Sequence, residues 1–456
     1  MKNLRLKLFF LCVMSIITLG ASAETHPDYL CFTLNNGYDG YIVLTCTGVI
    51  DYIPVEYSYD SYSWIDVPVN DQRGIMLLSN HDKIYFRKKG DDVAEQFSSP
   101  YVTYQFGLRG SIAVSGNIMS LIDQKCETKT IPCEYCFYKL FEGCTNLTSA
   151  PELPATTLAA HCYESMFEGC TNLTSAPELP AKTLVEGCYA RMFAECTSLN
   201  FMKVGFTEWP NESDYEFYNL PTFAWVDDIA DDGVFVCPDA LDKTQTGGNY
   251  INYIPLDFYP VFEVKANKDS KSENYYSTFY SGKNAYELPY YVTAYTGRVE
   301  GNVLKLVQME DDIIPPGEAV ILKSTEKQFY LKYYQPSPFF PDIPDKSEDN
   351  ELSGTDEETT LGANNYALSL GQYGVGFYDW SGRTIGANKA YLTLPGSQLA
   401  PGRSFGMVFD DGTVTGIPTT ILDQPQDDVI YNLQGQKVDE SCKGLIIKNG
   451  QKVYNF

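Results

Sequence analysis

The residues of this chain with the clearest chemical potential are its cysteines. Eight of the 13 cysteines lie between Cys126 and Cys196, and Cys133 forms with Cys136 a Cys-x-x-Cys pair, a spacing that zinc sites use. Zinc needs four ligands and no second pair stands at a suitable distance, so we expect no metal and no cofactor. Two interpretations remain open: buried thiols that pack as small hydrophobic residues, and disulfides between repeated positions.

A second candidate is Gly402–Gly406, which has the Gly-x-Ser-x-Gly spacing of a nucleophile elbow. An elbow joins a strand to a helix and its histidine follows the serine. Here the histidines that precede Ser404 are His26, His81 and His161, and none follows it. The segment Asp228–Asp239 falls short of a calcium loop, because Ala230 stands where an oxygen ligand belongs. We therefore expect a protein that is not an enzyme.

The elements that carry the cysteines repeat along the chain. Cys144–Ala155 returns almost letter for letter as Cys170–Ala181, and cysteine and phenylalanine recur with a period of 26 residues. A fixed period of this length is typical of a solenoid, whose units stack because no unit can bury its apolar face alone. The residues expected to form the buried core of the repeat are Cys136, Phe141, Cys144, Leu147, Cys162, Phe167, Cys170, Leu173, Cys188, Phe193 and Cys196.

Each repeat has two parts. In Cys162–Cys170 the apolar residues follow helical spacing, which predicts a short helix. Leu173–Leu179 is too short and too rich in proline for a helix, so it predicts an extended segment. We expect Leu173, Ala176 and Leu179 to face inward from that segment.

The other side chains of the extended segments predict a small polar face. It comprises Thr148, Ser149, Glu152, Thr174, Ser175 and Glu178. Two interpretations stay open. In the first, these residues are solvated and have no function. In the second, they form part of a recognition strip, because the exposed sheet is what repeat arrays usually present to partners.

The repeat resembles a known family. The Phe-x-Gly-Cys-Thr-x-Leu element at Phe167–Leu173 and the Leu-Pro-Ala-x-Thr-Leu element at Leu179–Leu184 are similar to those of BspA-like leucine-rich-repeat surface proteins of Bacteroides-type bacteria. The extended segment departs from the family's commonest form, since it carries Ala-Pro-Glu-Leu where Ile-x-Ile is usual. The resemblance implies a non-catalytic protein that adheres to host proteins or other cells.

The start of the chain has the pattern of a secretion signal. Positive charges come first, Leu8–Leu19 is apolar, and Ala21-Ser-Ala23 offers small residues for cleavage before Glu24. No other apolar run approaches the length of a membrane span, so we expect a secreted or cell-surface protein without a transmembrane span. The formal net charge is −26 at pH 7, which disfavours nucleic acid as a partner and leaves a surface protein or glycan.

These patterns predict a mixed, mostly β chain. After the signal peptide at 1–23, we expect a β-sandwich over 24–114, because short strands such as Tyr41–Cys46 alternate with turn residues. A leucine-rich-repeat array with caps (an α/β solenoid) then covers 115–258, a second β-sandwich 259–418 and a small β module 419–456. In one alternative, the repeats are a spacer and the aromatic-rich second sandwich binds glycans. In another, the chain is a hydrolase whose site escapes notice.

Overall fold

The computed structural model describes the chain apart from residues 1–27, 36–39, 48–53, 68–74, 78–80, 91–96, 100, 248–252, 302, 338–341, 372–373, 395–403, 417–429, 433–436, 439–443, 449–450 and 456. The predicted signal peptide and its cleavage site lie outside the described residues. The described part of the chain is mostly β and contains no α-helix. It divides into two compact units: Met1–Gly233 with Gln245–Phe258 (unit 1), and Val234–Thr244 with Tyr259–Phe456 (unit 2).

Unit 1 begins with two sheets. The strand order of the larger one is β4 (Ile65–Asp66), β3 (Val55–Ser58), β6 (Lys83–Lys88), β1 (Leu30–Leu34), β8 (Ile112–Ser115) and β9 (Leu147–Ser149). The smaller sheet places β2 (Gly40–Thr47) between β5 (Ile75–Leu77) and β7 (Thr103–Arg109). Buried residues alternate along β2 as the two-residue period of a strand requires. The rings of Phe32, Phe86 and Phe106 meet in one core, with centroids 4.9–5.3 Å apart.

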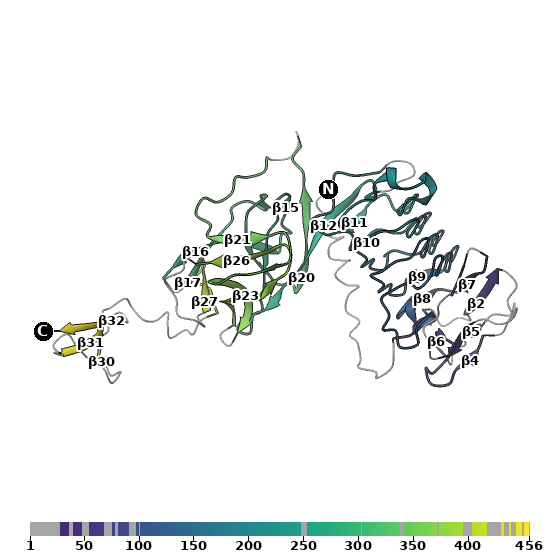
Figure 1. Ribbon diagram of the computed structural model, residues 1–456, viewed down its shortest axis with the longest axis horizontal. Helices are drawn as coiled ribbons and strands as arrows, with labels where there is room; N and C mark the ends of the chain where they lie inside the picture. The colour runs from purple at the N-terminus through teal and green to yellow at the C-terminus, as the bar shows by residue number, and fades with distance from the viewer. Residues whose placement is uncertain are drawn as a thin grey trace. The chain divides into compact units, whose positions relative to one another are not determined.

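A stack of turn segments follows in unit 1. We call four segments together the turn ladder: 135–143, 160–169, 186–195 and 219–227. Each of the first three hydrogen-bonds to the next. The N–H of Phe141 donates to the carbonyl of Met166 at 2.8 Å, and the N–H of Phe167 donates to that of Met192 at 2.9 Å. Figure 1 shows the segments as successive traces between β9 and β10 (Phe201–Lys203). The same backbone contact therefore recurs one repeat further along the chain.

The short helix predicted over Cys162–Cys170 is wrong. An α-helix donates each amide to the carbonyl four residues back, whereas here alternate amides cross to the next segment and the others bond three residues back. His161 and Ser165 both adopt a left-handed φ of 54°, which closes a turn every four residues. Apolar pairs spaced by four residues fit a 3.6-residue helix almost equally well over nine residues, so the pattern did not separate the two structures.

Short 3-10 helices and an aromatic cluster complete unit 1. The helices are η1 (Ile118–Leu121), η2 (Glu212–Asp214) and η3 (Phe217–Asn219). Trp225 is fully buried, with the rings of Phe206 and Trp209 6.1 and 6.3 Å away. Its indole N–H donates to the carbonyl of Tyr253 at 3.2 Å. These large rings cover the last segment of the turn ladder.

Unit 2 contains one large sheet and a smaller one. The large sheet runs β13 (Asn267–Lys268), β14 (Tyr275–Phe279), β19 (Val320–Ser324), β16 (Val292–Glu300), β17 (Val303–Gln308), β27 (Ser404–Phe409), β24 (Gly374–Asp379), β23 (Asn365–Gly371), β26 (Lys389–Thr393) and β21 (Leu352–Thr355), with β28 (Val414–Thr415) beside β27. The smaller sheet includes β11 (Gly233–Val236), β12 (Phe258–Lys265), β20 (Gln328–Tyr334), β15 (Ala285–Glu287) and β18 (Ile313–Ile314). A separate pair joins β22 (Thr359–Thr360) to β25 (Thr384–Ile385).

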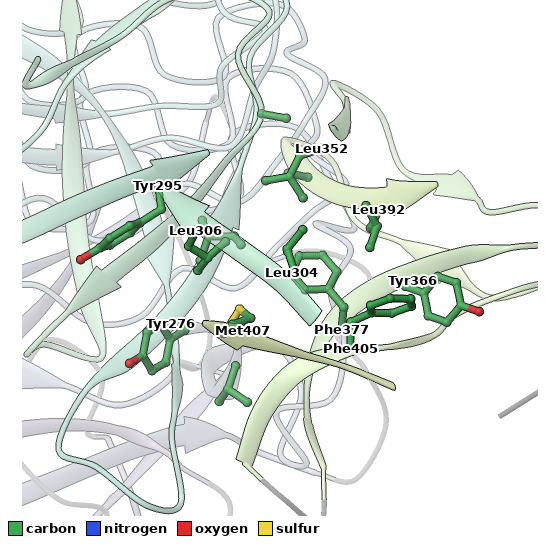
Figure 2. Packing of buried hydrophobic residues seen from close by; sticks show 14 of the residues in the cluster. Tyr276, Tyr295, Leu304, Leu306, Leu352, Tyr366, Phe377, Leu392, Phe405 and Met407 are labelled. Atoms are coloured by element: carbon green, nitrogen blue, oxygen red, sulfur yellow. The ribbon is translucent and has the colours of Figure 1, made fainter. Parts of the chain in front are cut away.

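At β19 the large sheet of unit 2 is buried on both faces. Along β19, Val320 and Leu322 enter a core shared with the smaller sheet, while Ile321 between them enters a second core. Strands from the two halves of the large sheet line this second core, as Figure 2 shows for Leu304 of β17 and Phe377 of β24. The sheet therefore curls around its own hydrophobic side chains.

The carboxy-terminal strands form a sheet of their own. Its order is β30 (Lys437–Val438), β29 (Ile430–Asn432), β31 (Gly444–Lys448) and β32 (Gln451–Asn455). The pairs β29–β30, β29–β31 and β31–β32 are antiparallel.

Candidate functional site

The first row of the predicted polar face lies on β9. Its hydroxyl groups bond to the neighbouring strand β8: Ser149 Oγ donates to the carbonyl of Val114 at 2.8 Å, and Thr148 Oγ1 donates to that of Ile112 at 3.3 Å. Thr148 also accepts a hydrogen bond from Asn35 Nδ2 at 3.0 Å. Both side chains are partly buried. These two residues therefore support the sheet edge and offer little surface to a partner.

The second row lies one repeat further along. Thr174 is exposed, and the hydroxyl of Ser175 donates to the carbonyl of Ala176 at 3.3 Å. Glu178 keeps 57% of its side chain exposed and pairs with Lys203 Nζ at 3.2 Å. This row is more accessible than the first, and its carboxylate is the strongest acceptor in it.

Glu152 and Glu178 give the face its charge. Glu152 is exposed as a whole residue. Partial desolvation of its carboxyl group raises its pKa, and the nearby carboxylates of Asp28 and Glu178 raise it further, while Lys129 lowers it. The smaller, electrostatic part of this shift reflects repulsion between the carboxylates of Glu152, Asp28 and Glu178 when all are ionised. A positively charged partner would relieve that repulsion, so we call Asp28, Glu152 and Glu178 the acidic row.

A dry core supports the acidic row. The inward-facing Leu173, Ala176 and Leu179 are 0%, 8% and 1% exposed. The residues expected to form the repeat core are all buried: Cys136, Phe141, Cys144, Leu147, Cys162, Phe167, Cys170, Leu173, Cys188, Phe193 and Cys196. Phe167 stacks between Phe141 and Phe193, with ring centroids 5.4 and 5.6 Å apart and planes 1° from parallel.

The cysteines of the described residues are free thiols. Burial raises the pKa of Cys144, Cys188 and Cys196 to about 12, so these thiols stay protonated at neutral pH. Cys196 Sγ donates to the carbonyl of Phe167 at 3.0 Å. They pack as small hydrophobic groups with a weak donor, which is one of the two interpretations left open by the sequence.

The sequence did not single out the surroundings of His161. Its ring stacks on Tyr135, with centroids 4.6 Å apart, and its Nδ1 lies 2.7 Å from Glu164 Oε2. The opposite face of the ring covers Gly187, where a Cβ would lie 2.2 Å from Nδ1. The hydrogen bond to Glu164 and the negative charge of Glu186 raise the pKa of His161, although burial opposes them. Tyr135, His161 and Gly187 lie one 26-residue period apart from one another. The repeat therefore contained the information that these three residues would be stacked.

A buried charged cluster in unit 2 also escaped the sequence analysis. Asp239 and Lys243 are 5% and 4% exposed. The groups that donate to the Asp239 carboxylate are Asn284 Nδ2 at 2.8 Å, Tyr286 Oη at 2.5 Å, Ser281 Oγ at 2.9 Å and Asn388 Nδ2 at 3.2 Å. Lys243 Nζ donates to the carbonyl of Asp239 at 2.6 Å. Because the cluster satisfies itself, we interpret it as a clasp that holds 234–244 in unit 2.

In the described part of the chain, no group of three or more histidine, cysteine, aspartate or glutamate side chains is arranged to hold a metal ion. Nor does this part of the chain contain a helix long and apolar enough to cross a membrane.

The chain was compared with known protein families, with curated proteins and with solved structures. None of the three comparisons gave a match.

Proposed function

We propose that this chain is a secreted or cell-surface BspA-like binding protein without catalytic activity. In this proposal the turn ladder and its extended segments form a short leucine-rich-repeat solenoid, and the protein adheres to a host or bacterial surface protein. The observation that carries the proposal is the acidic row. Two of its carboxylates, Glu152 and Glu178, stand at equivalent positions of successive repeats over a buried core, and Asp28 lies near Glu152.

The chemistry of the acidic row favours a basic partner surface. Glu178 is already paired with Lys203, which indicates that the row accepts ammonium groups at ordinary distances. A strip of two or three segments spaced by roughly 4.8 Å covers only a few hundred Å², against about 800 Å² per partner in a standard interface. Binding through the row alone is therefore weak, and many copies on a surface supply the avidity.

A glycan-binding function for unit 2 has less support. Most aromatic rings of the described part of 259–418 lie in the two cores, among them Tyr276, Tyr286 and Phe377. The ring that favours this alternative is Tyr290, which is 68% exposed. A Tyr290→Ala variant that lost glycan-array binding would move recognition to unit 2.

The test reverses two charges of the acidic row. Glu152→Lys with Glu178→Lys should reduce adhesion to immobilised matrix proteins or cells, and the loss should be larger at low salt. The matched control is Glu273→Lys with Glu300→Lys in unit 2, which makes the same change of charge at exposed side chains. Equal adhesion of the wild type and the acidic-row variant, with unfolding curves unchanged, would refute the proposal.

A further inference from the structure

Cys133 and Cys136 differ from the other described cysteines because they stand only three positions apart along the chain. The Cys133 thiol donates to the carbonyl of Ser98 at 3.9 Å, and the side chain of Cys136 lies close enough to influence the pKa of Cys133. Cys136 is fully buried and is the first of three equivalent repeat positions, followed by Cys162 and Cys188. Cys133 is partly exposed. The pair thus has one sulfur that solvent reaches and one that it does not.

The surroundings of Cys133 favour its thiolate. Interaction with the Cys136 side chain and a hydrogen bond from the backbone of Phe97 lower the pKa of Cys133 to about 7. Burial and the charge of Glu134 oppose this shift. Burial raises the pKa of Cys136 far above the ordinary range, so it holds its proton. Cys133 is therefore more readily ionised near neutral pH than an ordinary cysteine, and the thiolate is the reactive form.

We propose that Cys133 and Cys136 form a redox-active dithiol that exchanges with small-molecule disulfides, a function separate from adhesion. The Cys133 thiolate attacks one sulfur of a disulfide RSSR, the S–S bond breaks, and RS⁻ leaves with one proton as RSH. Cys136 then attacks Cys133 Sγ, the mixed S–S bond breaks, and the proton of Cys136 passes to the departing RS⁻, which leaves as the second RSH. Both cysteines are oxidised by two electrons in total, and RSSR is reduced to two RSH.

The backbone turn at 133–136 is suited to a disulfide between Cys133 and Cys136. Cys133 and Cys136 are the first and last residues of a four-residue turn, which brings their Cα atoms within about 7 Å. A disulfide needs roughly 4.4–6.8 Å between Cα atoms. Tyr135, inside the turn, already has a left-handed φ of 57° and stacks on His161, so the turn is fixed before the bond forms.

The first experiment measures alkylation of each thiol in the reduced full-length protein with limiting iodoacetamide at pH 7, followed by peptide mass spectrometry. Cys46 and Cys126 are internal controls of similar partial exposure, and burial raises the pKa of both. Because the pKa of Cys133 is lowered and those of both controls are raised, Cys133 should be alkylated about fivefold faster or more, even with its lower intrinsic nucleophilicity. Equal rates at Cys133 and Cys46 would overturn the proposal.

The second experiment uses glutathione disulfide as the oxidant. The wild type should form the Cys133–Cys136 crosslink, whereas Cys136→Ala, which keeps a small apolar group in the core, should stop at a glutathione adduct on Cys133. Cys46→Ala is the matched control and should crosslink like the wild type. Circular dichroism checks that each variant is folded. If Cys136→Ala does not fold, the wild-type crosslink decides alone, and its absence in excess glutathione disulfide at pH 7 contradicts the proposal.

Discussion

The column of phenylalanine rings is the feature whose removal should cost most. Phe167→Ala deletes a fully buried ring that stacks on Phe141 and Phe193. A buried phenylalanine-to-alanine change costs about 3–5 kcal/mol in lost burial and cavity formation. Each aromatic pair adds roughly 0.5–1.5 kcal/mol, and two pairs are lost here. We therefore expect a loss near the upper end, about 4–5 kcal/mol.

The assay is urea denaturation of the full chain followed by tryptophan fluorescence, since Trp225 lies in the cluster that covers the turn ladder. The control is Phe217→Ala in the same unit, because that ring is 54% exposed and its loss should cost about 1 kcal/mol. A loss below about 1 kcal/mol for Phe167→Ala would mean that the ring is not enclosed, and the stacked arrangement would have to be abandoned.

Four further predictions follow from the remaining features. Since its pKa is raised in the folded state, charged His161 stabilises unit 1 fully below about pH 6.5, and the contribution disappears as pH rises through the folded-state pKa; His161→Gln should flatten the pH dependence of the urea midpoint. Gly187→Ala should destabilise more than Gly143→Ala, because both have a left-handed φ but only the first meets the histidine ring; equal midpoints would contradict this. Asp239→Ala should cost about 3–5 kcal/mol in the unfolding of unit 2, since it leaves a buried lysine without its partner; a change below about 1 kcal/mol would be inconsistent with a clasp. Amino-terminal sequencing of secreted protein should begin at Glu24, and a lipid-bearing Cys12 would exclude that cleavage.

The sequence predicted features that repeat or alternate and missed those that depend on distant partners. The strand predicted at Tyr41–Cys46 lies within β2 because alternating burial is a local pattern. The 26-residue period located the rings that stack. It could not show that Ser165 would be left-handed, because nothing in the residue type requires that φ. The partners of Asp239 lie more than 40 residues away, and no local pattern connects them.

The hydrogen bonds of the turn ladder determine how this protein can change in length. Between the first three segments each crossing amide reaches a carbonyl 25 residues ahead, as Phe141 reaches Met166 and Phe167 reaches Met192, whereas the crossings to the fourth segment span 32 residues. A tandem duplication of Cys162–Gly187, which is one whole period, would reproduce each of these contacts and insert one more ring in the column. An insertion of a single residue inside a segment would shift the later amides of that segment out of register with the carbonyls of the next segment. The turn ladder can therefore be lengthened in steps of one 26-residue period, without any change to the existing residues.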